Sequence, residues 1–166
     1  MVAGGSLSIE GLWEILEAVK DPEIPTVSLV DLGVIYQAEI LPEGKVIVNM
    51  TPTFAGCPAI RFMQHEVERV LSEQNIPHEV RVNYDQPWNS NLVTERGRAR
   101  LKAFGLAPPP QFTGIPDLEI LLNNTACPFC DSHSTELRNP FGPTLCRSMH
   151  YCNDCRQMFE QFKPLG

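Results

Sequence analysis

Apolar residues recur along residues 8–84 with two different periods, one typical of helices and one typical of strands. A spacing of about three to four residues over 8–20 and 58–74 predicts two amphipathic helices, because it places apolar side chains on one helix face. Short alternating or continuous apolar runs predict three strands, over 34–41, 45–50 and 78–84. The resulting order α-β-β-α-β is typical of a small α+β domain whose helices pack on one face of a sheet.

Turn-forming residues mark the ends of these elements. Ser6 or Ser8 is expected to cap the first helix. Asp21-Pro22 is expected to end it, because proline disfavours a helical conformation in the residue before it. The prolines that follow, together with Gly33, predict a structured loop that leads into the first strand. Leu41–Lys45 then predicts the hairpin connection to the second strand.

Residues 96–102 carry four basic side chains and predict a short helix that starts near Thr94. We expect a solvated helix face there, or a docking edge for an acidic partner, because the surrounding chain is acidic and poor in aromatic residues. Ala107–Pro110 interrupts all periodicity, which is typical of a linker. The predicted organisation is therefore an α+β domain, a linker and a metal-binding module, over residues 8–106, 107–125 and 126–166.

Four cysteines near the end of the chain form two Cys-x-x-Cys pairs, Cys127 with Cys130 and Cys152 with Cys155. Each pair can aim two sulfurs at one point, and two pairs complete a tetrahedral metal site. This pattern predicts a four-cysteine zinc ribbon, although four sulfurs also accept iron. Cys146 lies between the pairs and is an alternative ligand. Arg147, His150 and Arg156 are expected to offset the charge of about −2 that four thiolates leave on a divalent ion.

The acidic net charge of the chain argues against two classes of binding partner, nucleic acids and membrane surfaces. The net charge is −7 over 166 residues, and the first 106 residues hold fourteen acidic and nine basic side chains. A nucleic-acid or membrane-surface binder would present a basic face, so we expect neither partner. No stretch has the length of a membrane span, and residues 1–6 lack the features of a signal peptide. We therefore expect a cytoplasmic protein, because paired cysteines in that reducing compartment favour metal ions over disulfides.

Cys57 stands apart from the paired cysteines, directly before Pro58 and the second predicted helix. The backbone N–H groups of a helix start would stabilise a thiolate there. The sulfur then serves as a nucleophile or as a soft-metal ligand, unless it only fills the junction as a small apolar group. Asp21, Glu23 and Asp31 bring carboxylates into the first loop. Acid–base work or hard-metal binding competes there with a structural role in a rigid turn.

Three motifs resemble the small domain of iron–sulfur cluster assembly and targeting factors: Asp21-Pro-Glu23, Asp31-Leu-Gly33 and Thr53-x-x-x-Cys57-Pro58. The later motifs are Cys-Pro-x-Cys, Phe141-Gly-Pro-Thr-x-Cys146-Arg, Cys-x-x-Cys and Phe162-Lys163. With the first domain they resemble the D-subunit family of phenylacetyl-CoA epoxidase, the multicomponent di-iron monooxygenase of bacterial phenylacetate degradation. The resemblance extends from about residue 8 to the end of the chain.

The resemblance implies an accessory protein, not itself catalytic, that helps to mature the oxygenase or reductase component of the epoxidase. It implies that Cys57, helped by Asp21 and Glu23, transiently holds iron or an iron–sulfur cluster. The ribbon would bind Zn²⁺ and supply folding energy or a docking surface. The alternative is a structural or electron-transfer subunit that stays bound to the oxygenase and carries iron in its ribbon. A homo-oligomer is compatible with both interpretations.

Overall fold

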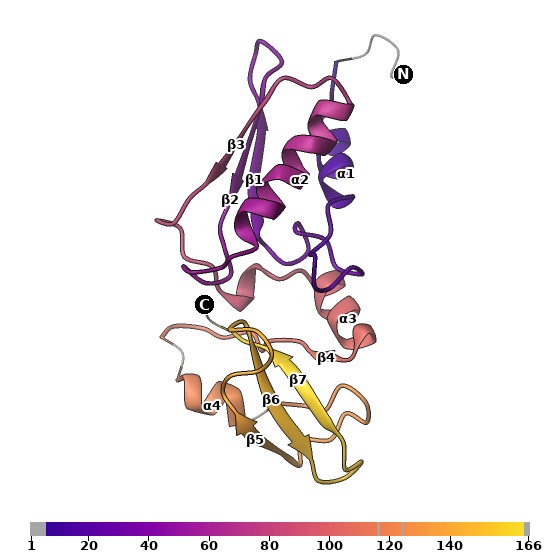
Figure 1. Cartoon of the computed structure of the whole chain (residues 1–166), viewed down its shortest axis with the longest axis vertical. Helices are drawn as coiled ribbons and strands as arrows, with labels where there is room; N and C mark the ends of the chain where they lie inside the picture. The colour runs from indigo at the N-terminus through magenta and orange to yellow at the C-terminus, as the bar shows by residue number, and fades with distance from the viewer. Residues whose placement is uncertain (1–5, 116, 124, 165–166) are drawn as a thin grey trace.

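The computed structural model describes residues 6–115, 117–123 and 125–164. Residues 1–5, which belong to the stretch inspected for a signal peptide, lie outside this range. So do positions 116 and 124 of the predicted linker and the last two residues of the predicted metal module. Figure 1 shows two sheets, one from each half of the chain, with α3 (Glu95–Phe104) beside the junction between them.

The first half contains α1 (Ile9–Glu17), β1 (Ile35–Ile40), β2 (Val46–Met50), α2 (Ile60–Glu73) and β3 (His78–Val82). β1 and β2 form an antiparallel hairpin, and β3 lies parallel to β2 on its other side. α2 is the crossover that a parallel pair requires, and it lies with α1 on one face of the sheet (Figure 1). The predicted α+β class and its element order are confirmed.

Hydroxyl side chains cap the first turns of α1 and α3. The Ser8 hydroxyl accepts the Gly11 N–H at 3.0 Å, and the Thr94 hydroxyl accepts the Gly97 N–H at 2.9 Å. The predicted cap at Ser8 and the predicted helix start near Thr94 are therefore confirmed. Two predicted boundaries are wrong. α1 ends at Glu17, three residues before the predicted end at residue 20. α2 begins at Ile60, so the proline expected at the first helical position lies in the preceding turn.

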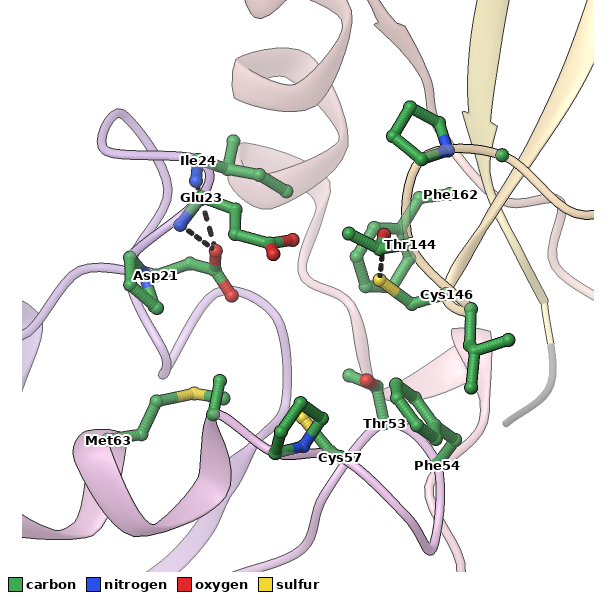
Figure 2. Close-up of a pocket in the computed structure, with 16 residues that line it drawn as sticks. Asp21, Glu23, Ile24, Thr53, Phe54, Cys57, Met63, Thr144, Cys146 and Phe162 are labelled. Carbon is green, nitrogen blue, oxygen red and sulfur yellow. Dashed lines mark hydrogen bonds between the residues drawn. The ribbon is translucent and has the colours of Figure 1, made fainter.

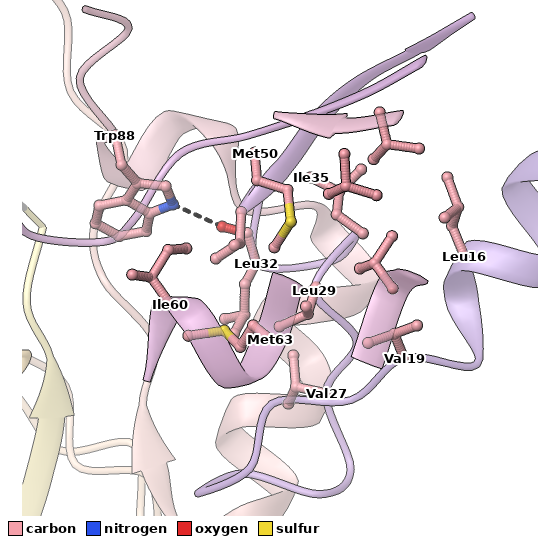
Figure 3. Close-up of a cluster of buried hydrophobic side chains, with 14 of the residues drawn as sticks. Leu16, Val19, Val27, Leu29, Leu32, Ile35, Met50, Ile60, Met63 and Trp88 are labelled. Atoms are coloured by element: carbon pink, nitrogen blue, oxygen red, sulfur yellow. Dashed lines mark hydrogen bonds between the residues drawn. The ribbon is translucent and has the colours of Figure 1, made fainter. Parts of the chain in front are cut away.

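A continuous apolar core lies between the helices and the sheet (Figure 3). Leu12 and Leu16 of α1 and Val67 and Leu71 of α2 have no exposed surface. Burying each such side chain contributes about 1.5–3 kcal/mol to folding. The predicted amphipathic pattern of both helices therefore corresponds to the observed buried face.

A 3₁₀ turn (Ser90–Leu92) ends the first half, and the second half begins with α3. It continues with β4 (Leu106–Ala107), α4 (Leu118–Asn123), β5 (Thr135–Asn139), β6 (Arg147–Cys152) and β7 (Met158–Phe162). The sheet order is β4-β7-β6-β5, with β4 parallel to β7 and the other pairs antiparallel. The short strand that follows α3 therefore belongs to the sheet of the ribbon.

The two halves share apolar contacts. The ring of Phe162, at the end of β7, packs edge-on against Trp88 with 5.6 Å between ring centroids, and Phe162 joins the core of the first half. The indole N–H of Trp88 donates to the Leu32 carbonyl at 2.7 Å (Figure 3). The Ser90 N–H donates to the Pro164 carbonyl at 2.9 Å. These contacts fix the end of the ribbon sheet against the first half.

The predicted linker is held to the first half at its beginning. The hydroxyl of Ser90 donates to the Pro110 carbonyl at 2.7 Å, and the side-chain amide of Asn91 donates to the Phe112 carbonyl at 2.8 Å. Its second part contains α4. The exact division of the chain into domains stays a prediction. No helix in the described ranges is long and apolar enough to span a membrane.

The basic helix α3 uses most of its charges in ion pairs within the molecule, while the side chains of Arg96, Arg100 and Lys102 remain 52%, 38% and 46% exposed. The predicted solvated face therefore also has a structural role. Arg96 and Arg100 each approach the Asp31 carboxylate to 2.9 Å, and the Asp31 side chain has no exposed surface. Lys102 pairs with Asp131 of the ribbon. A Cβ on Gly97 would lie 2.7 Å from the Asp31 carbonyl oxygen, so glycine allows this close approach. The basic segment therefore holds the molecule together.

Candidate metal centres

The ribbon brings its four paired cysteines to one point. Cys127 and Cys130 precede β5, whereas Cys152 ends β6 and Cys155 lies in the turn before β7. All four Sγ atoms lie within 4.8 Å of one another, and the Cys127–Cys155 and Cys130–Cys152 distances are both 3.6 Å. Tetrahedral bonds of about 2.3 Å place sulfurs roughly 3.8 Å apart. The four side chains therefore fit a single metal ion.

Two turns of the same shape present these sulfurs. In each turn the residue after the second cysteine adopts a left-handed conformation, Asp131 and Arg156 both with φ of 60°. The N–H of that residue donates to the carbonyl of the first cysteine at 2.9 Å in both turns. Backbone N–H groups of Cys155 and Asp154 also hydrogen-bond to Cys152, which lowers the pKa of the Cys152 thiol to about 7. Burial raises the pKa of Cys155 in the same turn to about 12, so the second turn favours a thiolate at Cys152 only.

Of the three side chains expected to offset the charge of this metal site, His150 and Arg147 do not have that role. His150 has no exposed surface and stacks on Phe159 with 5.3 Å between ring centroids. Burial lowers the pKa of His150 to about 4, so the ring is neutral at pH 7 and the predicted compensation by His150 is wrong. Arg147 pairs with Glu160 at 2.8 Å instead, and Arg156 is exposed beside the second turn.

A second candidate site is a pocket of about 320 Å³ between the two halves of the chain (Figure 2). The first half contributes the loop 21–24 and the segment 53–59 before α2, together with Met63. The ribbon contributes the turn 142–146 and Phe162. We call this the interdomain pocket. It is lined by two thiols and two carboxylates, those of Cys57, Cys146, Asp21 and Glu23.

The carboxylates of the interdomain pocket have different settings. Asp21 accepts the N–H groups of Glu23 at 2.8 Å and of Ile24 at 3.0 Å, so it shapes the turn that carries Glu23 (Figure 2). Burial raises the pKa of Asp21 despite these hydrogen bonds. Glu23 extends toward the space between the two halves, and its side chain is 46% exposed. Its carboxylate lies 3.7 Å from Arg147 of the ribbon.

Cys57 lies three residues before α2 begins, and backbone N–H groups of Ala59 and Ile60 hydrogen-bond to its sulfur. Burial nevertheless raises the pKa of Cys57, and the nearby carboxylates of Asp21 and Glu23 raise it further. The predicted thiolate stabilisation by the helix start is therefore outweighed. The Cys57 thiol therefore keeps its proton at neutral pH.

Cys146 does not join the four sulfurs of the ribbon. It precedes β6 on the opposite side of the interdomain pocket from Cys57 (Figure 2). Its sulfur lies 3.1 Å from the Thr144 hydroxyl. Burial raises the pKa of the Cys146 thiol, and the charge of Glu23 adds to this effect. The structure thus places the sequence-predicted spare ligand at a different site.

Three residues singled out from the sequence therefore meet in one place, Asp21, Glu23 and Cys57. Asp31, the third carboxylate of the first loop, faces α3 and belongs to the structural ion pairs. Sequence reasoning missed Cys146 as a member of this pocket. The available signal was the turn sequence Gly142-Pro-Thr-Leu-Cys146, which contains turn-forming residues but does not reveal what the turn faces.

Comparisons with known proteins find a matching family for each half of the chain. Residues 9–84 match the family model described as iron–sulfur cluster assembly protein, and residues 121–163 match the PaaD zinc beta ribbon domain. A solved structure from Bacillus anthracis, a domain of unknown function, has a TM-score of 0.51 and 30% sequence identity. That likeness covers 55% of this chain and 89% of the other.

Two relatives extend these matches. A Porphyromonas gingivalis protein named Fe-S protein maturation auxiliary factor is 33% identical over 55% of this chain and 89% of its own length. An Escherichia coli K12 protein, provisionally named as the D subunit of 1,2-phenylacetyl-CoA epoxidase, is 32% identical over 93% of this chain and 92% of its own length. The chain therefore belongs to the PaaD family, in which an iron–sulfur cluster assembly domain is followed by a zinc beta ribbon.

Proposed function

We propose that this protein is a non-catalytic maturation factor of the bacterial phenylacetyl-CoA epoxidase. It would assist the insertion of iron or an iron–sulfur cluster into the oxygenase or reductase component. The likeness of the first half to a maturation auxiliary factor and of nearly the whole chain to a D subunit supports this role. The single observation that carries the proposal is the interdomain pocket, which places the Cys57 thiol among carboxylates.

The chemistry of the interdomain pocket suits a transient cargo. A thiolate is a strong ligand for iron, whereas carboxylates bind it less tightly and exchange more readily. Cys57 is only partly buried and Glu23 is about half exposed, so a partner could reach the cargo. We place this activity in the cytoplasm, where a free thiol stays reduced.

A growth experiment tests the role of Cys57. A strain that lacks this protein and depends on phenylacetate as carbon source is complemented with the wild type or with Cys57→Ser. We expect the serine variant to fail, because a hydroxyl does not replace a thiolate as an iron ligand. Met158→Leu is the matched control, since it alters an exposed sulfur outside the pocket at similar volume. Full growth with Cys57→Ser would refute the carrier role.

For the ribbon we propose Zn²⁺ held by Cys127, Cys130, Cys152 and Cys155. The module has few buried apolar residues of its own, so bound metal would supply folding energy. Protein purified without oxygen should contain about one zinc ion per chain and be colourless. Stoichiometric iron with strong visible absorption would instead favour the electron-transfer interpretation.

A further inference from the structure

Both halves of the chain contribute walls to the interdomain pocket, so neither half contains the complete pocket. Cys57, Asp21 and Glu23 come from loops of the first half, and Cys146 comes from the turn before β6 of the ribbon. In Figure 2 the Cys146 sulfur and the Glu23 carboxylate extend toward the same space from opposite sides. The pocket therefore has sulfur on both of its walls.

The ribbon turn is fixed by hydrogen bonds on both sides of Cys146. The Gly142 N–H donates to the Arg147 carbonyl at 2.7 Å and closes the turn. The Lys163 N–H donates to the Cys146 carbonyl at 2.9 Å and ties the turn to the residue that follows β7. Thr144 contacts the Cys146 sulfur at 3.1 Å and orients it. Cys146 is thus held in place as a positioned side chain.

A positive charge on the ribbon also lies close to the interdomain pocket. Arg147, next to Cys146, lies 3.7 Å from Glu23 and 2.8 Å from Glu160, and its side chain is only 13% exposed. This arginine bridges the two halves and partly balances the negative groups around the pocket. A cation that binds there would replace the thiol protons and take over that balance.

We propose that Cys57 and Cys146 are two sulfur ligands of one cargo site, so that the ribbon completes the site of the assembly domain. This inference rests on the proposed carrier function and names its ligands. The cargo class is thiolate-bound iron, either as an ion or as an iron–sulfur cluster, with Glu23 and Asp21 available as oxygen ligands. Binding forms two metal–sulfur bonds and releases one proton from each thiol.

The ligand groups of the interdomain pocket are spaced more widely than those of the ribbon, which suits a cargo that is later released. Among the described residues, the ribbon cysteines form the group whose ligand atoms all lie within 4.8 Å, whereas the four pocket groups line a cavity of about 320 Å³. The ribbon site is therefore preorganised for one small ion. The interdomain pocket is roomier and mixes sulfur with oxygen ligands, which favours a larger or more readily released occupant.

Cobalt(II) provides a probe that counts thiolate ligands. Full-length protein with a zinc-loaded ribbon is titrated with cobalt(II) without oxygen, and the sulfur-to-cobalt charge-transfer absorption is recorded. Zinc stays in the ribbon because it binds such sites more tightly than cobalt. We expect Cys57→Ser and Cys146→Ser each to lower the absorption to about half, and the double variant to abolish it. Met158→Leu, which alters an exposed sulfur outside the pocket, should match the wild type.

A second arm replaces cobalt by ferrous iron, with and without sulfide, which distinguishes an ion from a cluster. Cys146→Ala is used beside Cys146→Ser, and retained ribbon zinc shows that each variant is folded. Undiminished cobalt absorption in both Cys146 variants would overturn the two-thiol site, as would no pocket binding in the wild type. The carrier function is judged separately, because it fails only if Cys57→Ser supports growth.

Discussion

Asp31 is the carboxylate on which the contact between the first loop and α3 depends. Its carboxylate accepts a hydrogen bond from the Thr94 hydroxyl at 2.8 Å and forms ion pairs with Arg96 and Arg100. The Asp31 side chain has no exposed surface. Burial alone would raise the pKa of Asp31, but the hydrogen bonds and charges of these neighbours outweigh it and lower the pKa. The ionised form is therefore the one that the folded protein stabilises.

Asp31→Asn is expected to lower the free energy of unfolding at pH 7 by about 2–3 kcal/mol. This is less than for a fully buried pair, because both guanidinium groups are partly exposed. The folded-state pKa of Asp31 lies below its unfolded value, so the stabilisation is complete above about pH 4 and is lost as the pH falls through the folded pKa. Urea unfolding at several pH values measures this difference. A gap between the two proteins that stays constant into strong acid would contradict it.

Asp21 illustrates how the same residue type takes another role a few positions earlier. Its pKa is raised by burial, and its partners are backbone N–H groups of its own turn. The cationic side chain that acts on it is Arg147, from the other half of the chain. Both carboxylates stand in similar loop motifs, so the sequence alone left the choice between a structural and a metal-binding role open for each.

At the scale of elements, the sequence predicted most of the fold because its signals are local. Helix caps, alternating strands and the hairpin connection act over a few residues, and Ser8, Thr94 and the order of the first five elements are confirmed. The end of α1 and the start of α2 were misplaced by two or three residues, because helix boundaries fray and local signals define them less sharply than the helix itself. The Cys-x-x-Cys spacing predicted the ribbon cluster for the same local reason.

The role of α3 could not be read from its composition. Four bases in a short helix are most often solvated, yet Arg96 and Arg100 bind a carboxylate more than sixty positions earlier in the chain. Arg98 donates to the Ser90 carbonyl at 2.7 Å and also to Pro109, so it holds the start of the predicted linker. Such pairings depend on long-range topology. For the same reason Cys146 could not be assigned to the interdomain pocket from sequence.

At the scale of the whole molecule, the ribbon covers one side of the interdomain pocket and is anchored to the first half through β7 and β6. Phe162 inserts into the first core, and Arg147 reaches Glu23. The cysteines that we propose as ligands of the ribbon metal flank the same strands, since Cys152 ends β6 and Cys155 precedes β7. The proposed metal site and the interdomain pocket are thus joined through β6 and β7, so we expect the order of the pocket wall to depend on the bound metal.

Removal of the ribbon metal with a chelator should therefore raise the alkylation rates of both Cys146 and Cys57 by about tenfold or more. Cys146 gains exposure because its turn loosens, and Cys57 because the ribbon no longer covers it. Mass spectrometry after brief treatment with iodoacetamide measures both rates. Hydrogen exchange of β1 and β2 is the control, since these strands should remain protected. Faster alkylation of Cys146 with an unchanged rate at Cys57 would show that the ribbon does not cover the pocket, and the two-domain cargo site would then lose its structural basis.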